Sequence, residues 1–292
     1  MVRELPLSSS ICPAATAVTE LVRQAGGQLG NRLEAELLLA HALDVERAWL
    51  YAHGEAKPSQ AQRVRFQALI ERRRHGEPLA YMLGYREFYG RPFKVNQAVL
   101  IPRPETELLV DTALEIVRHP EATIVDVGTG SGCIALTLAA ERPRWRVAAV
   151  DVSANALAVC RRNAELLQLP RVEMLQGDLL APVAERRFHA IVSNPPYVAA
   201  GDPHLAQGDL RFEPDVALSA GDHGLGVIRR LIEQARHLLW PGGWLLIEHG
   251  YDQALPIQQL FAGAGFEQLS TRKDLADIER VTLGAWPLDR RA

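Results

Sequence analysis

From residue 122 onward, two patterns of apolar and polar positions alternate along the chain. Four short apolar runs predict buried strands, at residues 124–125, 147–150, 191–192 and 245–247. Between them, apolar residues recur every three or four positions, which predicts helices over residues 154–167, with Ser153 as N-cap, and over residues 225–239. Strands that alternate with helices are typical of a parallel sheet covered on both faces. We therefore predict an α/β domain in this part of the chain.

The pattern before residue 84 is helical throughout. It predicts one helix over residues 16–25 that ends at Gly26-Gly27, a second over 32–43, and a third over 58–74 that begins with a proline. The third helix ends in Arg72-Arg73-Arg74, which suits the negative end of the helix dipole. Two interpretations of these arginines stay open: a solvated last turn, or a contact for RNA or an acidic partner.

Residues 84–101 change character again. Aromatic and β-branched residues with turn signals predict a β-hairpin that links two domains. A further helix is expected to open at residues 102–107 and to run to about residue 117. The predicted organisation is a helical domain at residues 1–83, a hairpin linker at 84–101 and an α/β domain at 102–292. Residues 199–224 form a long polar stretch, a length at which loops tend to carry function.

Charge and cysteine usage narrow the class of protein. The 292 residues carry a net charge of −3, so no overall positive field holds a nucleic-acid backbone. Cys12, Cys133 and Cys160 are widely spaced, which predicts neither a disulfide framework nor a metal site and fits a reducing compartment. The sequence has no recognisable signal peptide and no apolar run near the roughly 20 residues of a membrane span. We expect a cytoplasmic protein.

The most informative stretch is Asn194-Pro195-Pro196-Tyr197, directly after the apolar run at 191–192. Two prolines cannot continue a strand, so the chain must turn there and leave Asn194 at the strand's end. Ligands of open α/β sheets bind outside these carboxyl ends. An asparagine oxygen and a neighbouring backbone carbonyl can each accept one N–H of a planar NH₂ group. The stretch therefore indicates chemistry on an amide or amino nitrogen, although an Asx-Pro turn without chemistry is the alternative.

A glycine-rich loop follows the first strand, with glycines at positions 128, 130 and 132. Such glycines allow a tight turn and a close approach of the backbone to a ligand at the start of a helix. A dinucleotide fingerprint requires a third glycine or alanine where Cys133 stands, and a P-loop requires Gly-Lys-Ser/Thr, which is absent. Neither NAD nor ATP is well supported.

The spacing from Asp126 to Gly132 resembles motif I of class I S-adenosylmethionine-dependent methyltransferases. This resemblance implies that an acidic residue at the end of the second strand binds the ribose, and Asp151 stands there. It also implies that the end of the third strand contacts the adenine. Asp178 and Leu179 lie at that point, with the role of Asp178 left open. Some relatives carry an aromatic residue at the Leu179 position, so a stacking contact is missing here.

Motif I combined with Asn-Pro-Pro-Tyr defines amino-methyltransferases, and nearly the whole chain resembles one branch of them. This branch is the bacterial peptide chain release factor glutamine methyltransferases (HemK/PrmC type). The resemblance is carried by the following segments: 88–93, 101–107, 194–197, 211–214, 241–243 and 279–281. It implies a Rossmann-like domain with a mostly parallel seven-stranded sheet, joined by the hairpin to an N-terminal helical bundle that docks the substrate.

The resemblance also implies the reaction and the site. A methyl group would pass from S-adenosylmethionine, leaving S-adenosylhomocysteine, to the side-chain nitrogen of the glutamine in the release factors' Gly-Gly-Gln loop. Asn194 and the Pro195 carbonyl would hold the glutamine NH₂, with Pro196 beside them and Tyr197 packed against the amide. The methionine part of the cofactor would be lined by a run of five residues: Gly128, Thr129, Gly130, Ser131 and Gly132. No metal is expected, and the protein is expected to be a monomer.

The roles of four further residues, and three rival functions, remain to be considered. Phe93 either borders the cofactor or belongs to the core, and Glu105 either borders the cofactor or caps a helix. His189 and His249 are interpreted as structural, and no Asp, His or Lys stands beside Asn194 as a general base. The rival functions are an adenine-N6 DNA methyltransferase, a non-catalytic adaptor and, more distantly, a nicotinamide oxidoreductase. The negative net charge and the lack of a recognisable target-recognition domain oppose the DNA enzyme.

Overall fold

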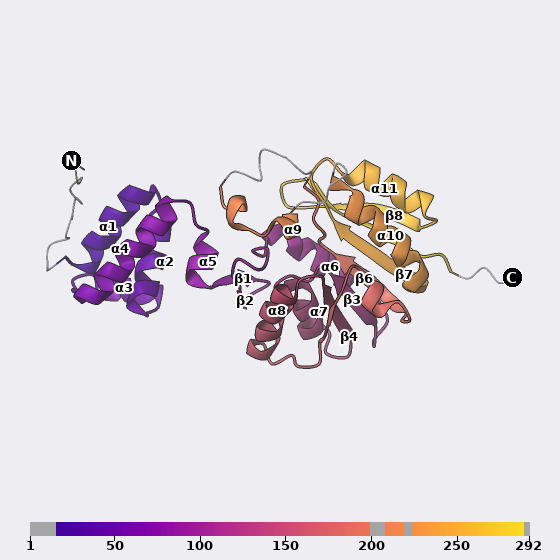
Figure 1. Cartoon of the computed structure of the whole chain (residues 1–292), viewed down its shortest axis with the longest axis horizontal. Coiled ribbons are helices and arrows are strands. Elements are labelled where there is room, and N and C mark those ends of the chain that lie inside the picture. The colour runs from indigo at the N-terminus through magenta and orange to yellow at the C-terminus, as the bar shows by residue number, and fades with distance from the viewer. Residues whose placement is uncertain (1–15, 199–207, 219–223, 289–292) are drawn as a thin grey trace, which may run out of the picture. The chain divides into compact units, whose positions relative to one another are not determined.

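The computed structural model of the protein describes residues 16–198, 208–218 and 224–288 (Figure 1). Contacts within the chain divide it into two units, at Met1–Leu83 and Gly84–Ala292. Cys12 and most of the polar stretch at residues 199–224 lie outside the described residues. No helix among the described residues has the length and apolar character needed to span a membrane.

The first unit consists of helices around its own apolar core. Their bounds are α1 Val18–Leu29, α2 Arg32–Leu43, α3 Arg47–Ala52, α4 Gln60–Arg74 and α5 Leu79–Leu83. The predicted end of the first helix at Gly26-Gly27 is wrong, because α1 continues to Leu29 and ends at Gly30 in the left-handed conformation (φ 66°). Gly26 serves packing instead: a Cβ atom there would lie 3.3 Å from the Cα of Arg32.

Helix α4 begins later than predicted because a serine supplies its start signal. The Ser59 hydroxyl accepts from the Gln62 backbone N–H, and the Gln62 side chain accepts from the Ser59 N–H. This reciprocal capping box satisfies two backbone donors that would otherwise lack partners, so the helix starts at Gln60 and leaves the proline outside.

The three arginines at the end of α4 each form an ion pair within the first unit. Arg72 pairs with Glu77 (2.6 Å), Arg73 with Glu34 (2.7 Å) and Arg74 with Glu71 (3.2 Å). Arg73 and Glu34 are only about one-fifth exposed, with side-chain exposures of 20% and 19%. These contacts favour the structural interpretation of the cluster over a contact for RNA.

The second unit begins with the predicted hairpin, formed by β1 (Tyr85–Phe88) and β2 (Arg91–Lys94). Phe88 and Phe93 are buried in the core of this unit. Asn163 fastens the hairpin to the rest of the unit. Its Oδ1 accepts from the Lys94 backbone N–H (2.7 Å), and its Nδ2 donates to the carbonyls of Lys94 and Ser131. The hairpin is therefore an integral part of the second unit.

A seven-stranded sheet forms the centre of the second unit, in the order β5-β4-β3-β6-β7-β9-β8. Its strands are β3 Thr123–Val127, β4 Arg146–Asp151, β5 Glu173–Gln176, β6 Phe188–Ser193, β7 Leu239–Glu248, β8 Glu267–Lys273 and β9 Glu279–Ala285. The first five strands in this order pair in parallel, and β9 pairs antiparallel with both β7 and β8. The predicted α/β class with a mostly parallel sheet is confirmed.

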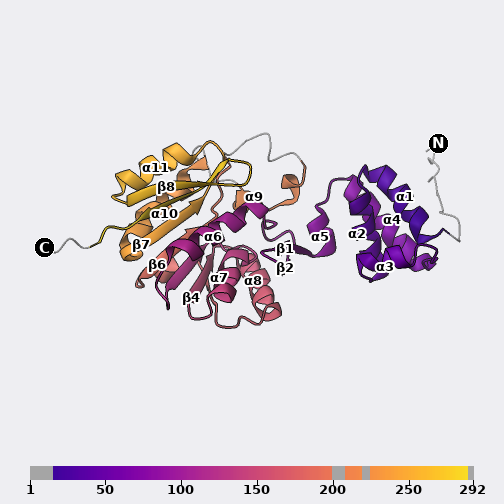
Figure 2. The ribbon, with the colours of Figure 1, turned by 180° about the vertical axis from the view of Figure 1, so that it is seen from behind.

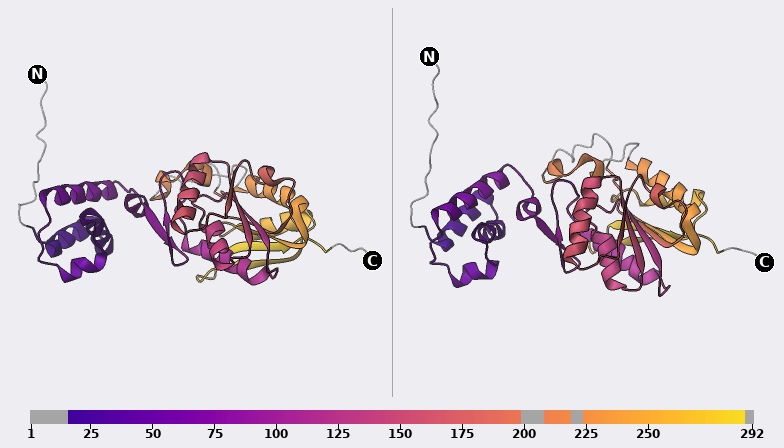
Figure 3. Two further views of the ribbon diagram at one scale, coloured as in Figure 1. Left: turned by 90° about the horizontal axis from the view of Figure 1, so that it is seen from below. Right: turned by 60° about the horizontal axis from the view of Figure 1, so that its bottom comes forward.

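Helices cover both faces of this sheet (Figures 1 and 2). Their bounds are α6 Glu107–Ile116, α7 Cys133–Glu141, α8 Ala154–Leu166, α9 Asp215–Leu218, α10 Gly226–Leu238 and α11 Ala254–Gly263. Ile124 joins the core cluster under α6, α7 and α8, whereas its neighbour Val125 joins the cluster under α10 and α11. Successive residues of one strand thus enter opposite layers, as the pleat requires, and Figure 3 shows the sheet between these layers. Short 3-10 helices complete the unit at Pro104–Thr106 (η1), Ala181–Val183 and Leu210–Phe212.

Candidate active site

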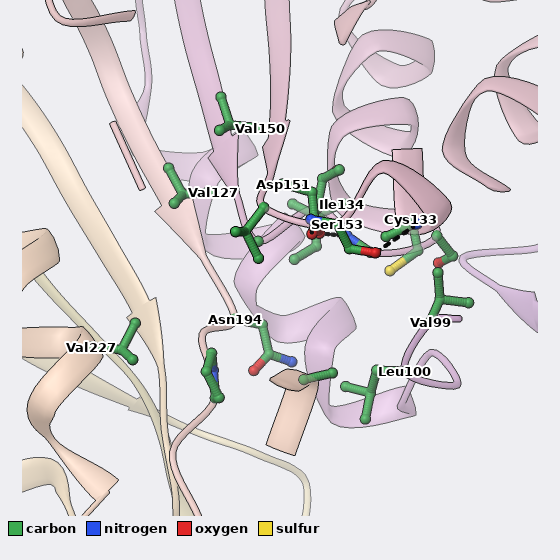
Figure 4. Close-up of a pocket in the computed structure, with 18 of the residues that line it drawn as sticks. Val99, Leu100, Val127, Cys133, Ile134, Val150, Asp151, Ser153, Asn194 and Val227 are labelled. Atoms are coloured by element: carbon green, nitrogen blue, oxygen red, sulfur yellow. Dashed lines mark hydrogen bonds between the residues drawn. The ribbon is translucent and has the colours of Figure 1, made fainter. Parts of the chain in front are cut away.

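A cavity of about 320 Å³ opens at the carboxyl ends of β3, β4 and β6 (Figure 4). The chain runs from β3 outward to β5 and then returns to the other side of β3 with β6. Such a reversal of strand order creates the crevice where open α/β sheets bind ligands. Apolar side chains such as Leu100, Val127 and Val150 form much of its wall. The volume is within the range of roughly 300–1,000 Å³ typical of ligand sites.

The glycine loop forms one side of this cavity. Gly128 and Gly130 have φ values of 74° and 55°, which residues other than glycine rarely adopt. The loop from Gly128 to Ser131 lines the cavity, whereas Gly132 lies behind it. A Cβ atom at Gly132 would come within 2.5 Å of the Cys160 sulfur on α8. Gly132 therefore shapes the loop from behind by allowing close packing.

Asp126, at the start of the glycine motif, supports the loop from inside the protein. Its Oδ2 accepts from the Thr129 hydroxyl (2.6 Å) and from the Ala135 backbone N–H (3.2 Å). Its Oδ1 is buried and has no hydrogen-bond partner among the described residues. Burial raises the pKa of this carboxyl to about 7.

The ends of β4 and β5 supply the predicted polar residues. Asp151 is partly buried, and its two carboxylate oxygens accept from the backbone N–H groups of Gly130 and Ser153, each at 2.9 Å. Burial raises its pKa, and these N–H groups oppose that rise. Asp178 and Leu179 also line the cavity. The exposed Asp178 carboxylate forms an ion pair with Arg230 of α10.

Asn194 follows β6 and lines the cavity, as Figure 4 shows. Its Nδ2 donates to Oε1 of Glu248 (2.9 Å) and to the hydroxyl of Thr106 (3.2 Å). These two contacts occupy the donor end of the amide. They leave its oxygen, Oδ1, as the end that can accept a hydrogen bond from a ligand.

The rest of the Asn-Pro-Pro-Tyr stretch is held from behind. Pro196 lines the cavity, whereas Pro195 is buried and Tyr197 packs against the core on the α10 side. The backbone carbonyl of Tyr197 accepts from Nε2 of Gln253 (3.0 Å), and Oε1 of Gln253 accepts from the Gly250 N–H (3.0 Å). Burial and the negative charge of a nearby carboxylate raise the pKa of the Tyr197 hydroxyl to about 12. The two hydrogen bonds of Gln253 attach this turn to the loop that follows β7.

Sequence reasoning missed Glu248, the acidic residue beside Asn194. The signal was available, because Glu248 directly follows the apolar run at 245–247, just as Asp151 follows the run at 147–150. Strands β6 and β7 are neighbours, and Ser193 pairs with Ile247 in their register. The next residue of each strand then brings Asn194 and Glu248 together. Thr106, which also contacts Asn194, was missed because it is 88 residues away in sequence.

The other candidates take structural positions. Phe93 is a fully buried core residue, and Glu105 is exposed on η1, outside the cavity wall. His189 accepts at Nδ1 from the Thr123 N–H (2.9 Å), and His249 bonds to the hydroxyl of Thr282 (2.9 Å). These positions support core packing for Phe93 and structural roles for both histidines.

An ion pair between Arg103 and Glu213 lies at the cavity wall. Arg103 lines the cavity and donates to Oε1 of the buried Glu213 (2.5 Å), whose other oxygen accepts from the Ile101 N–H (3.4 Å). The segment at residues 208–218 is thus attached to the chain that precedes α6. Cys133 and Cys160 are buried free thiols, and within the described parts of the chain no group of His, Cys, Asp or Glu side chains is arranged to hold a metal ion.

The sheet order, the glycine loop after β3 and the cavity at the strand ends define a class I methyltransferase fold. In agreement, the family model of the Methyltransferase small domain matches residues 104–208, and that of the PrmC N-terminal domain matches residues 16–84. A methyltransferase from Pyrococcus furiosus is similar in structure, with a TM-score of 0.54 and 18% identity over 76% of this chain and 100% of that one. This likeness concerns the fold alone.

Curated relatives identify the family within this class. Release factor glutamine methyltransferase of Xylella fastidiosa (strain 9a5c) is 46% identical over 93% of this chain and 96% of that protein. Release factor glutamine methyltransferase of Escherichia coli (strain K12) is 44% identical over 91% of this chain and 96% of that protein. The chain belongs to the release factor glutamine methyltransferase family, and the predicted resemblance is confirmed.

Proposed function

We propose that this protein transfers a methyl group from S-adenosylmethionine to the side-chain nitrogen N5 of the glutamine in the Gly-Gly-Gln loop of peptide chain release factors. One observation carries the proposal. Asn194 lies at the edge of a cofactor-sized cavity with its donor end engaged by Glu248 and Thr106, which leaves an acceptor for an NH₂ group. Membership of the family supports a release factor as the substrate.

The residues around the cavity fit S-adenosylmethionine. We assign the methionine part to the loop of Gly128, Thr129, Gly130 and Ser131, with Gly132 setting the shape of that loop. We assign the ribose to Asp151, whose carboxylate oxygens can each accept a further hydrogen bond beside their backbone partners. The adenine is assigned to the wall at Asp178 and Leu179. When bound, this cofactor supplies an electrophilic methyl group on a positively charged sulfur.

The protein's contribution to the reaction is orientation and charge stabilisation. An amide nitrogen is a poor nucleophile, because its lone pair is delocalised into the carbonyl. Asn194 Oδ1 and the Pro195 carbonyl would accept the two N–H groups and aim the nitrogen at the methyl carbon, with Pro196 and Tyr197 packed beside the amide. The same acceptors stabilise the positive charge that develops on nitrogen as its bond to the methyl carbon forms and the carbon–sulfur bond breaks. The nitrogen then loses one proton, to water or to a backbone carbonyl.

The remaining assignments follow from the substrate. We assign docking of the release factor to the helical domain at residues 1–83, which forms a unit of its own. We further infer that the active form is a monomer. A release factor substrate places the reaction in the cytoplasm. The net charge of −3 opposes DNA as a substrate, and the curated relatives do not favour the adenine-N6 alternative.

Mass spectrometry of the reaction product tests the proposal. Unmethylated release factor, the same factor with the Gly-Gly-Gln glutamine replaced by alanine, and adenine-containing DNA are each incubated with the protein and S-adenosylmethionine. We expect one methyl group on that glutamine and none in the other two samples. Asn194→Ala should slow the reaction on the order of 10²-fold, by analogy with the loss of one stabilising hydrogen bond in other enzymes. Methylated DNA with unmodified release factor would refute the proposal, and near-full turnover by Asn194→Ala would refute the role of Asn194.

A further inference from the structure

Glu248 is a buried carboxylate in direct contact with the amide assigned to substrate binding. It is 2% exposed, lies at the end of β7, and accepts from Asn194 Nδ2 at 2.9 Å. Its second oxygen, Oε2, is buried and has no hydrogen-bond partner in the described parts of the chain. A buried carboxylate with one unused oxygen costs folding free energy, so a contribution to packing alone does not explain it.

We infer that Glu248 is a positioning residue, which holds the Asn194 amide with its nitrogen inward so that Oδ1 faces the substrate nitrogen. This inference rests on the function proposed above. An ionised carboxylate can only accept hydrogen bonds. If the Asn194 amide turned over, its oxygen would face the Glu248 oxygen and the two acceptors would repel. The carboxylate therefore selects one of the two amide orientations, the one that can receive an N–H from the substrate.

The Thr106 hydroxyl alone does not select that orientation. A hydroxyl both donates and accepts, so it can bond to either end of an amide. Thr106 contacts Asn194 Nδ2 at 3.2 Å, a longer distance than the 2.9 Å to Glu248. The selection thus depends on Glu248 and on its remaining ionised.

The ionisation of Glu248 is set by groups on several elements. Burial raises its pKa to about 7. The Thr106 hydroxyl and the positive charge of Arg280 on β9 oppose this rise, whereas the negative charge of Glu105 on η1 adds to it. The side chains of Tyr197 and Cys133 lie near enough to be affected by the charge of Glu248, and burial raises their own pKa values to about 12, so neither titrates near neutrality. As pH falls through 7, Glu248 gains a proton and becomes able to donate to a turned-over amide.

Steady-state kinetics with two substitutions tests the inference. Glu248→Ala removes the acceptor, and we expect kcat to fall about 10- to 10²-fold while KM for S-adenosylmethionine changes less than about threefold. Glu248→Gln restores an acceptor of the same shape, so we expect kcat to recover in part. The wild-type kcat should rise with pH around neutrality, and this rise should be clearly smaller in Glu248→Gln, in which Asp126 is the one of these two buried carboxyls that still titrates there. Glu165→Gln, at an exposed position on α8, is the control and should match the wild type.

A kcat within threefold of wild type in Glu248→Ala, or an unchanged pH dependence in Glu248→Gln, would overturn the inference. If Glu248→Ala fails to fold, the pH profile of the Glu248→Gln variant still decides the question. A merely structural role would lower the amount of folded protein without altering the pH dependence of kcat.

Nuclear magnetic resonance tests the orientation independently of activity. The side-chain NH₂ signals of Asn194 in ¹⁵N-labelled protein, assigned through their loss in Asn194→Asp, should shift as pH crosses neutrality in the wild type and stay constant in Glu248→Gln. Signals that do not shift in the wild type would overturn the inference. Signals that shift as expected in a protein that methylates no release factor would support the positioning of Asn194 and refute only the proposed substrate.

Discussion

Replacing Gly132 by alanine should destabilise the second unit through two effects that the structure separates. Gly132 has φ 82°, and a left-handed conformation costs a residue with a side chain about 1–2 kcal/mol. The new methyl group would also lie 2.5 Å from the Cys160 sulfur and 3.0 Å from Cδ1 of Leu136. Overpacking of this kind costs about 1–3 kcal/mol. We therefore expect the free energy of unfolding to fall by about 2–5 kcal/mol.

Gly130→Ala is the matched control for the conformational effect. Gly130 has φ 55°, but a Cβ atom there would meet no atom within 4 Å. Its substitution should cost only the conformational penalty of about 1–2 kcal/mol. Adding Cys160→Ala to the Gly132→Ala variant removes the atom that the methyl group meets, so the double variant should lose less stability than the two single changes predict together.

Urea denaturation measures these differences. The chain has two units, so each needs its own probe if they unfold separately. Tryptophan fluorescence from Trp145 and Trp244 reports on the second unit, and Trp49 lies in the first. If Gly132→Ala loses no more stability than Gly130→Ala, the close contact with Cys160 does not constrain the loop and the reasoning is refuted.

Two further predictions concern the turn after β6 and the histidines beside β3. Gln253→Ala removes the hydrogen bonds to the Tyr197 carbonyl and the Gly250 N–H. Since each is worth about 1 kcal/mol, we expect kcat to fall about 5- to 30-fold with little change in cofactor affinity measured by calorimetry, and an unchanged kcat would contradict the role of this tie. Burial and the nearby His119 lower the pKa of His189 in the folded protein, so the unfolded chain takes up the proton first. The contribution of His189 to the free energy of unfolding should be fully present above its pKa in the unfolded chain, about 6.5, and should fall as pH drops below that value. Thermal unfolding of His189→Gln should show a weaker decline of stability over the same pH range.

The main elements of the α/β domain could be predicted because their signals are local. An apolar run such as residues 147–150 is buried on both faces in a parallel sheet, and Ser153 caps the following helix in the structure as predicted. The end of α1 could not be predicted this way. Glycines at positions 26 and 27 read as a stop, but Gly26 is needed where Arg32 approaches α1, and the stop is at Gly30. A glycine required for packing and one required for a turn look the same in sequence.

The residues of the site likewise fall into those that local sequence signals predict and those that they do not. Asn194 and Asp151 could be predicted because each follows its own strand and motif. Glu248 and Thr106 contact Asn194, and Gln253 contacts Tyr197, from positions far away in sequence. The order and register of β6 and β7 bring Glu248 to Asn194, and the packing of the surrounding segments brings the other two. Knowledge that β7 neighbours β6 would have been sufficient to find Glu248, but strand order is a property of the whole sheet.

The contact between the hairpin and Asn163 has a consequence for protein synthesis. Lys94 and Asn163 are 69 residues apart in sequence, whereas the helical unit is complete at residue 83. At about 5–20 residues per second, the ribosome needs roughly 3–14 s to add the segment between them. The helical unit can fold during this interval, while Phe88 and Phe93 remain exposed on the nascent chain. The newly made hairpin therefore stays without its Asn163 partner until α8 has been synthesised.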